Sequence, residues 1–170
     1  MMELFFKPKS VAVIGASGTP GKLGYVIVKN IVDSDFAGEV YPVNPKSDEI
    51  LGYKVYRSVT EIPGEVDLVV TALPTPKLTV ATMQECANKG VKAVISESAG
   101  FAEMGGEGVS FQQQIVDIAK KNDNRVMGPN CSGIVSRNIV TSIYPMTKKV
   151  PNGNVVLIGQ SGLLAAGMAS

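Results

Sequence analysis

Apolar residues recur along this chain in two alternating patterns, short continuous runs and longer runs with helical spacing. The continuous runs are rich in β-branched residues and cover 10–15, 67–73 and 92–98. Such runs are typical of strands covered on both faces, as in parallel sheets. Residues 39–45 predict a second strand in chain order, and residues 125–135 predict a short strand that runs into a turn.

The segments between the predicted strands have the spacing of amphipathic helices. Residues 74–90 predict a helix with Gly90 at its C-terminal cap, and residues 110–122 predict another that begins at Ser110. The apolar stripe of the first helix is formed by Leu78, Val80, Met83 and Ala87, and that of the second by Phe111, Ile115, Ile118 and Ala119. Strands that alternate with helices through short connections imply right-handed crossovers. The predicted fold is therefore α/β, a Rossmann-like, doubly wound parallel sheet.

The 170 residues are enough for one well-cored domain and part of a second. We assign residues 1–145 to the first domain and 146–153, which hold a proline and a glycine, to a linker. Residues 154–170 predict a strand, a turn and the beginning of a helix. A strand and part of a helix cannot close a core, so we expect the natural polypeptide, or its assembly, to continue beyond Ser170.

Charge and composition narrow the classes of partner. The formal net charge is +1, which gives no overall field to attract nucleic acid or an acidic membrane. No apolar run approaches the roughly 20 residues that span a bilayer. The two cysteines and the absence of a signal-peptide core favour a reducing, cytoplasmic setting. The chain has no histidine, so chemistry that needs an imidazole must find it on another chain or segment.

A glycine-rich loop follows the first predicted strand, with Gly15, Gly18, Gly21 and Gly24 at three-residue spacing. Glycines here allow a tight turn and let backbone N–H groups approach a pyrophosphate at the positive end of a helix. The spacing is G-x-x-G-x-x-G, which occurs in several nucleotide-binding families. The loop therefore predicts a nucleotide-like cofactor without naming it.

Lys46 narrows the choice of cofactor. A protein that binds NAD usually has a carboxylate at the end of the second strand, where it binds the ribose 2′-hydroxyl. This chain has Lys46 there. A lysine favours a ribose that carries a phosphate, either NADP with its 2′-phosphate or coenzyme A with its 3′-phosphate.

Two hypotheses follow from that phosphate. Tyr144 and Lys148 have the Tyr-x-x-x-Lys spacing of NADP-dependent short-chain reductases, but Pro145 makes a continuous helix between them improbable. The loops at 72–76 and 96–101 suit coenzyme A better. The first offers prolines as a rigid apolar border for pantetheine, and the second offers small side chains and hydroxyls.

Five segments in register carry a resemblance to a known family: FFKPKSVAVIGAS, VYPVNPK, GVKAVISESAGFAE, GPNCSGI and VVLIGQSG. They resemble landmarks of the nucleoside-diphosphate-forming acyl-CoA synthetases. This is the ADP-forming acetate–CoA ligase type, related to the succinyl-CoA synthetase α subunit. The resemblance covers essentially the whole chain. It implies a Rossmann-like CoA-binding domain followed by the truncated start of a flavodoxin-like ligase domain.

The resemblance also implies roles for particular residues. Lys46 would meet a CoA phosphate, and Leu73 and Pro74 would border the pantetheine. Ser98 and Ala99 would lie against the nucleotide part. The CoA diphosphate would be wrapped by Ser17, Gly18, Thr19 and Pro20.

At the other end of the ligand, Asn130 and Cys131 would face the thioester chemistry. Ser161 and Gly162 would open a helix whose N-terminus receives a phosphorylated histidine. A thiol nucleophile at Cys131 is not expected, because nothing near it in the sequence supplies a base.

The implied reaction converts acyl-CoA, ADP and phosphate into the acid, CoA and ATP through an acyl phosphate and a phosphohistidine. This chain lacks that histidine, so we expect it to bind CoA without turning over by itself. ATP, ADP and Mg²⁺ are expected only in the missing ligase and ATP-grasp domains, in the same chain or another subunit, and the complete enzyme is expected to be an oligomer. The alternative is a CoA-sensing module fused to a protein acetyltransferase. No metal site is expected in this chain.

Overall fold

The computed structural model describes residues 2–146, 153–162 and 167. Its centre is a parallel sheet of five strands in the order β2-β1-β5-β6-β7. The strands are β1 (Ser10–Ile14), β2 (Glu39–Val43), β5 (Leu68–Thr71), β6 (Ala93–Ser96) and β7 (Arg125–Met127). A separate antiparallel pair is formed by β3 (Glu49–Ile50) and β4 (Tyr53–Lys54). The predicted α/β, Rossmann-like sheet is confirmed.

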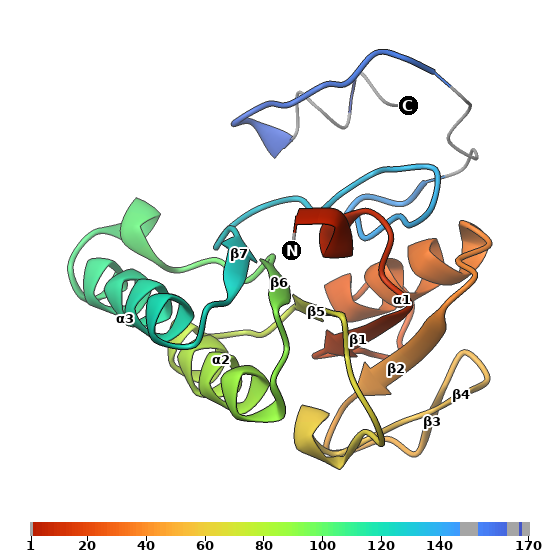
Figure 1. Cartoon of the computed structure of the whole chain (residues 1–170), viewed down its shortest axis with the longest axis horizontal. Coiled ribbons are helices and arrows are strands. Elements are labelled where there is room, and N and C mark those ends of the chain that lie inside the picture. Colours follow the sequence, from red (N-terminus) through yellow and green to blue (C-terminus); the bar gives the residue numbers. More distant parts are fainter. Residues whose placement is uncertain (1, 147–152, 163–166, 168–170) are drawn as a thin grey trace.

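Helices cover both faces of this sheet. Helix α1 (Leu23–Asp33) packs on one face, and α2 (Pro76–Lys89) and α3 (Glu107–Lys121) pack side by side on the other (Figure 1). Short 3-10 helices lie at Met2–Phe5, Val59–Glu61 and Ala102–Met104. Alternate residues of each strand point to opposite faces, so Val11 and Val13 pack with α1 while Ala12 and Ile14 pack with α2 and α3. Both faces of the sheet are therefore apolar and buried.

Helix α2 has the predicted caps but a different buried face. Thr75 accepts a hydrogen bond from the N–H of Leu78 at 3.4 Å, and Gly90 closes the helix with a φ of 85°. Leu78 is 49% exposed, so the predicted stripe is wrong at that position. The buried side chains are Thr79, Thr82, Met83 and Cys86. Two of these four residues are threonines, so the buried face of α2 is less apolar than the sequence pattern predicts.

Helix α3 begins four residues earlier than predicted. Its first residue is Glu107, and Gly106 occupies the N-cap position in place of Ser110. Gly108 lies close against the backbone of Phe101, which leaves no room for a side chain. This contact makes the first turn possible, and periodicity alone does not reveal it. The predicted apolar stripe of α3 does pack inward, with Ile115 only 2% exposed.

Segment 153–162 departs from the sequence-based prediction. The predicted strand does not form over these residues, although Gly162 already has helical backbone. Val155, Val156 and Ile158 are 81 to 91% exposed. A strand needs a second strand to pair its N–H and C=O groups, and no strand within the described part of the chain pairs with this segment (Figure 1). The predicted boundaries of the linker and second domain stay predictions, and residues 147–152 lie outside the described residues.

Candidate functional site

Five loops meet at one edge of the sheet, because the carboxyl ends of parallel strands share an edge. In the spatial order of the strands, the loop after β2 carries Lys46, that after β1 is the glycine loop, and that after β5 carries Leu73 and Pro74. The loops after β6 and β7 follow, with Ser98 and Ala99 in one and Asn130 and Cys131 in the other. All five strands are parallel, but β2 lies on one side of β1 while β5, β6 and β7 follow on the other, so the strand order reverses at β1 and the glycine loop lies at the topological switch point.

The glycine loop delivers the start of α1 to this edge. Lys22 is the N-cap residue and makes no side-chain capping bond, and the first turn holds no acidic residue. The first N–H groups of a helix have no acceptor inside the helix. Ser17 is half-buried, and Gly18, Thr19 and Pro20 are exposed in the loop that leads into this helix. This arrangement suits an anion.

Two glycines of the loop have packing roles that the motif alone did not reveal. Gly15 has a φ of 89°, and a side chain there would run into the carbonyl group of Ala72. A side chain at Gly24 would run into the carbonyl oxygen of Gly15. Gly24 therefore lets α1 rest on the end of β1, whereas Gly18 faces open space with Ile50 as its nearest neighbour.

The loop after β2 is joined to the glycine loop by Asn44. Its Nδ2 donates to the carbonyl oxygen of Ala16 at 2.7 Å, and its Oδ1 accepts from the N–H of Lys46 at 2.8 Å. The Lys46 side chain is exposed beside the glycine loop. A lysine held this way can meet a phosphate at the same edge.

Arg57 is a supporting residue that the sequence did not single out. Its guanidinium donates to the carbonyl oxygens of Pro45 and Ser47 at 2.9 and 3.0 Å and pairs with Asp48 at 2.5 Å. These bonds brace the turn that carries Lys46. No sequence motif marks Arg57, because its partners are backbone carbonyls brought close by the fold.

The loops after β5 and β6 are tied together by Ser98. Its hydroxyl accepts from the N–H of Leu73 at 2.9 Å, and its side chain is 3% exposed. Pro74 and Ala99 are exposed, and Leu73 is half-buried. Ser98 therefore shapes the edge with its side chain, whereas Pro74 and Ala99 are free to touch a ligand.

The loop after β7 turns sharply, with Gly128 at φ 100° and Asn130 at φ 53°. The N–H of Asn130 donates to the carbonyl oxygen of Ser98 at 2.9 Å, which joins this loop to its neighbour. Burial raises the pKa of the Cys131 thiol to about 11, with a smaller contribution from the nearby Glu97 carboxyl. A thiol with such a pKa is mostly protonated at neutral pH.

The predicted helix start at Ser161 and Gly162 lies against this same loop. A side chain at Gly162 would collide with the side chain of Ser132. The structure thus brings together two motifs that are about 30 residues apart in the sequence. Glycine allows the helix start to approach Ser132 so closely.

Glu97 is a further buried residue of this edge that no sequence motif marks. It follows β6 and is 5% exposed, and neither carboxylate oxygen has a hydrogen-bond partner among the described residues. Burial raises the pKa of the Glu97 carboxyl well above its ordinary value. An acidic residue directly after a continuous apolar strand was the available signal in the sequence.

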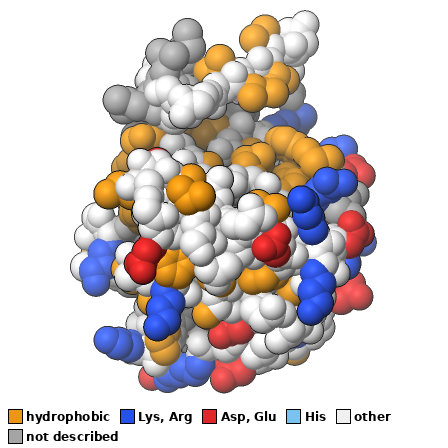
Figure 2. All heavy atoms as spheres, turned by 90° about the vertical axis from the view of Figure 1, so that its left-hand side faces the viewer, with side chains coloured by type: hydrophobic (Ala, Val, Ile, Leu, Met, Phe, Trp, Pro, Cys, Tyr) orange, Lys and Arg blue, Asp and Glu red, His pale blue; other side chains and the backbone are white. Residues whose placement is uncertain are grey.

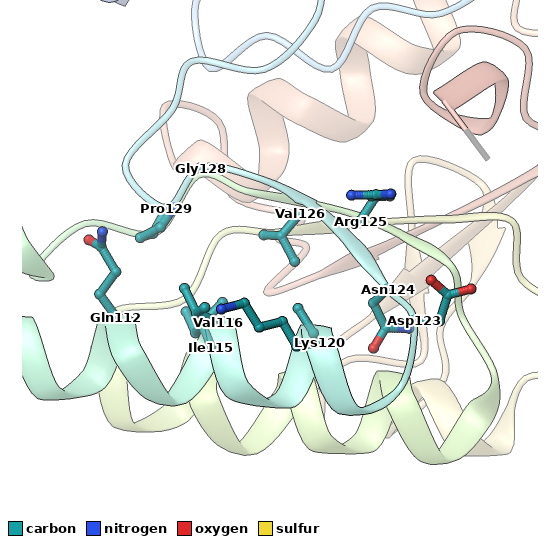
Figure 3. Close-up of a pocket in the computed structure, with 11 residues that line it drawn as sticks. Gln112, Ile115, Val116, Lys120, Asp123, Asn124, Arg125, Val126, Gly128 and Pro129 are labelled. Carbon is teal, nitrogen blue, oxygen red and sulfur yellow. The ribbon is translucent and has the colours of Figure 1, made fainter.

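A separate pocket of about 460 Å³ lies between α3 and the edge strand β7 (Figure 3). Lys120 and Arg125 border it, and Gly128 and Pro129 line the end nearest the loop after β7. None of the residues predicted to bind CoA lines this pocket. The predicted ligand edge and this pocket are therefore different places on the molecule.

The remaining chemistry of the described residues is limited. No group of three potential metal ligands occurs among the residues that the structure describes. No helix of the described chain is long and apolar enough to cross a membrane. Acidic and basic side chains are interspersed on the face shown in Figure 2, without the single-sign patch typical of nucleic-acid sites. Tyr144 is not helical, which removes the geometry a reductase needs, and Lys148 lies outside the described residues.

The sequence of this chain matches a known protein family. The family model described as "CoA binding domain" matches residues 9–137. This chain belongs to the CoA-binding domain family. The match covers every strand of the sheet and four of the five loops completely, and reaches past Asn130 and Cys131 in the fifth.

Known proteins resemble this member of the CoA-binding domain family over nearly its full length. The α subunit of the ADP-forming acetate–CoA ligase II of Pyrococcus furiosus is 46% identical over 99% of this chain. A crystal structure from Pyrococcus horikoshii OT3 matches with a TM-score of 0.91, 43% identity and 99% coverage. The Ca. Korarchaeum cryptofilum dinucleotide-forming acetyl-coenzyme A synthetase 1, in complex with phosphate and ADP, matches with a TM-score of 0.91 and 34% identity over 99% of this chain.

The CoA-binding domain is one part of these larger proteins. The chain spans 36% of the Pyrococcus furiosus subunit, 38% of the Pyrococcus horikoshii chain and 36% of the Korarchaeum chain. The resemblance to ADP-forming acyl-CoA synthetases predicted from the five sequence segments is confirmed by these relatives.

Proposed function

We propose that this chain is the CoA-binding part of an ADP-forming acyl-CoA synthetase. One observation carries the proposal: the order of the loops along the sheet edge matches the order of groups along coenzyme A. Lys46, the glycine loop, Leu73 with Pro74, and Asn130 with Cys131 follow one another from β2 to β7. Coenzyme A presents a ribose phosphate, a diphosphate, pantetheine and a thiol in that same order.

Each group of the ligand meets suitable chemistry in this arrangement. Lys46 binds the 3′-phosphate, and the N-terminus of α1 behind Ser17, Gly18, Thr19 and Pro20 binds the diphosphate. Leu73 and Pro74 border the pantetheine. Ala99 and the backbone of Ser98 adjoin the pantetheine as well, since β6 lies farther from Lys46 than β5 does. This differs from the nucleotide contact that the resemblance implies for them.

The reaction we propose for the complete enzyme joins a carboxylic acid to CoA at the expense of ATP, or runs in reverse. Asn130 and Cys131 face the thioester end, and the helix start at Ser161 and Gly162 accepts a phosphohistidine that this chain does not contain. ATP, ADP and Mg²⁺ bind to other domains. Residues 146–153 act as a linker to a ligase domain that starts at 154. The assembly is oligomeric and works in the cytoplasm.

Parallel calorimetric titrations of the purified chain with CoA, 3′-dephospho-CoA and NADP test the proposal. We expect CoA to bind, a clear loss of affinity without the 3′-phosphate, and little affinity for NADP. The chain alone should form no ATP from acyl-CoA, ADP and phosphate, because it has no histidine. Tighter binding of NADP than of CoA, or robust turnover by this chain, would contradict the proposal.

A further inference from the structure

Glu97 stands out because a buried charge normally has a partner. Its side chain is 5% exposed, and both carboxylate oxygens lack hydrogen-bond partners among the described residues. Burying an unpaired carboxylate costs several kcal/mol, so such a group is usually neutralised by a proton, a cation or a donor. The described residues include no group of three ligands that could hold a cation there.

The atoms around Glu97 identify what neutralises it. Its Oε1 and both oxygens of Thr141 lie closer than 3.0 Å to the position that a Cβ would take at Gly133. Oxygen atoms therefore converge on one side of Gly133. An ionised carboxylate would add negative charge to this group of oxygens, whereas a neutral carboxylic acid would not.

This contact lies directly beneath the reactive end of the predicted ligand edge. Thr141 is held by two hydrogen bonds to Ile134, at 2.8 and 2.9 Å, so it forms a fixed support. Gly133 follows Cys131 and Ser132, and Ser132 touches Gly162. The Glu97 carboxyl contributes to the raised pKa of the Cys131 thiol, so the two groups are close enough to interact. Glu97 thus lies close to three features: the loop after β7, the fixed residue Thr141, and, through Ser132, the helix start at Gly162.

We propose that Glu97 is a positioning residue that, as a neutral carboxylic acid, holds Cys131–Gly133 in place from below. Through this loop it positions both the thiol end of CoA and the helix start at Gly162. The role in CoA binding rests on the proposed function, whereas the effect on the loop does not. A proton on Glu97 keeps the loop closed, and loss of that proton loosens it.

Alkylation of Cys131 by iodoacetamide reports on the loop without any ligand. Cys86 is 1% exposed and serves as an internal control. Peptide mass spectrometry measures the extent of alkylation at each of the two cysteines. Truncation in E97A should raise the alkylation rate of Cys131 about tenfold by easing local opening, while the neutral isostere E97Q should stay within about twofold of the wild type at pH 6.5.

The pH dependence of the Cys131 alkylation rate shows whether Glu97 holds the loop through its proton or only by filling space. The ratio of the wild-type rate to the E97Q rate removes the ionisation of Cys131 that both proteins share. An ionised Glu97 raises the pKa of the Cys131 thiol and so by itself lowers this ratio, which means that a rise in the ratio reports opening of the loop. We expect that ratio to lie near one at low pH and to climb as Glu97 ionises. A ratio that stays flat up to pH 9, or an E97Q variant as reactive as E97A, would overturn the proposal. This comparison remains decisive if E97A does not fold.

Calorimetry with two ligands then tests the link to CoA. E97A should weaken CoA about tenfold but leave 3′,5′-adenosine diphosphate unchanged, because that ligand lacks the pantetheine arm and does not reach the loop. Equal losses for both ligands would contradict positioning of the thiol end. Failure of the wild type to bind either ligand would refute the proposed function, and the alkylation rates would still decide the role of Glu97 in the loop.

Discussion

Asn44 connects the two loops that we assign to the phosphates of CoA, because its Nδ2 donates to the carbonyl oxygen of Ala16 at 2.7 Å while its Oδ1 accepts from the N–H of Lys46. One side chain thus sets the spacing between the glycine loop and the lysine. The charge of Lys46 is useful to a ligand only when the lysine stands at the correct distance from the helix start.

Asn44→Asp tests this connection, since aspartate keeps the acceptor for Lys46 and loses the donor to Ala16. We expect the affinity for CoA to fall about tenfold, in keeping with the loss of a hydrogen bond worth about 1 kcal/mol and an added negative charge near phosphate. Calorimetric titration measures the change. Asn138→Asp is the matched control, because Asn138 lies away from the ligand edge and donates to Phe6. An equal loss in both variants would contradict the role of Asn44.

Lys46→Ala tests the phosphate contact. A charge-assisted contact is worth about 1.5 to 3 kcal/mol, so CoA should bind about 10 to 100 times more weakly. Binding of 3′-dephospho-CoA should change little, because it lacks the group that Lys46 meets.

The control for Lys46 is Lys9→Ala, which removes the same charge at the opposite end of β1. Its affinities for both ligands should match those of the wild type. If Lys46→Ala weakens CoA and 3′-dephospho-CoA equally, Lys46 does not bind the 3′-phosphate.

Gly24→Ala and Gly18→Ala should separate folding from binding within one loop. A methyl group at Gly24 collides with the carbonyl oxygen of Gly15, so the free energy of unfolding should drop by about 1 to 3 kcal/mol. A methyl group at Gly18 faces open space, with Ile50 Cγ1 4.0 Å away, and should leave stability nearly unchanged. The Gly18→Ala methyl group should instead weaken the binding of CoA, because it prevents the diphosphate from approaching the backbone N–H groups of the loop.

Urea unfolding and calorimetry on both glycine variants check this separation. The prediction is wrong if Gly18→Ala unfolds as easily as Gly24→Ala, or if it binds CoA as tightly as the wild type.

Glu97 should make stability depend on pH. Burial raises its pKa well above the ordinary value of 4.5, so the folded chain keeps a proton that the unfolded chain releases. Folding then takes up a proton, and the free energy of unfolding falls as pH rises from about 4.5 toward the folded-state pKa. Above that pKa the loss is complete and levels off.

The variant E97Q removes this proton uptake. Urea midpoints measured from pH 4 to pH 9 should show E97Q and the wild type close together at pH 4, with E97Q gaining in relative stability as pH rises. A constant difference across that range would mean that Glu97 titrates with its ordinary pKa.

The sequence by itself determined the sheet and most of the ligand edge. Continuous β-branched runs such as 10–15 and 67–73, separated by amphipathic helices, favour a parallel sheet covered on both faces, and parallel strands bring their carboxyl-end loops together. Gly90 ended α2 where predicted, because a glycine cap is a local property. Lys46 and the glycine loop lie near each other for the same reason of topology.

The tertiary structure decided what depends on contacts between distant segments. The start of α3 depends on Gly108 packing against Phe101, and the brace at Arg57 depends on carbonyls that only the fold gathers. The predicted strand within 154–160 does not form, because pairing needs a neighbour as well as propensity. Glu97 is an ordinary acidic residue in the sequence. Its character comes from being buried against Gly133 and Thr141, since the surroundings of a carboxyl set its proton affinity.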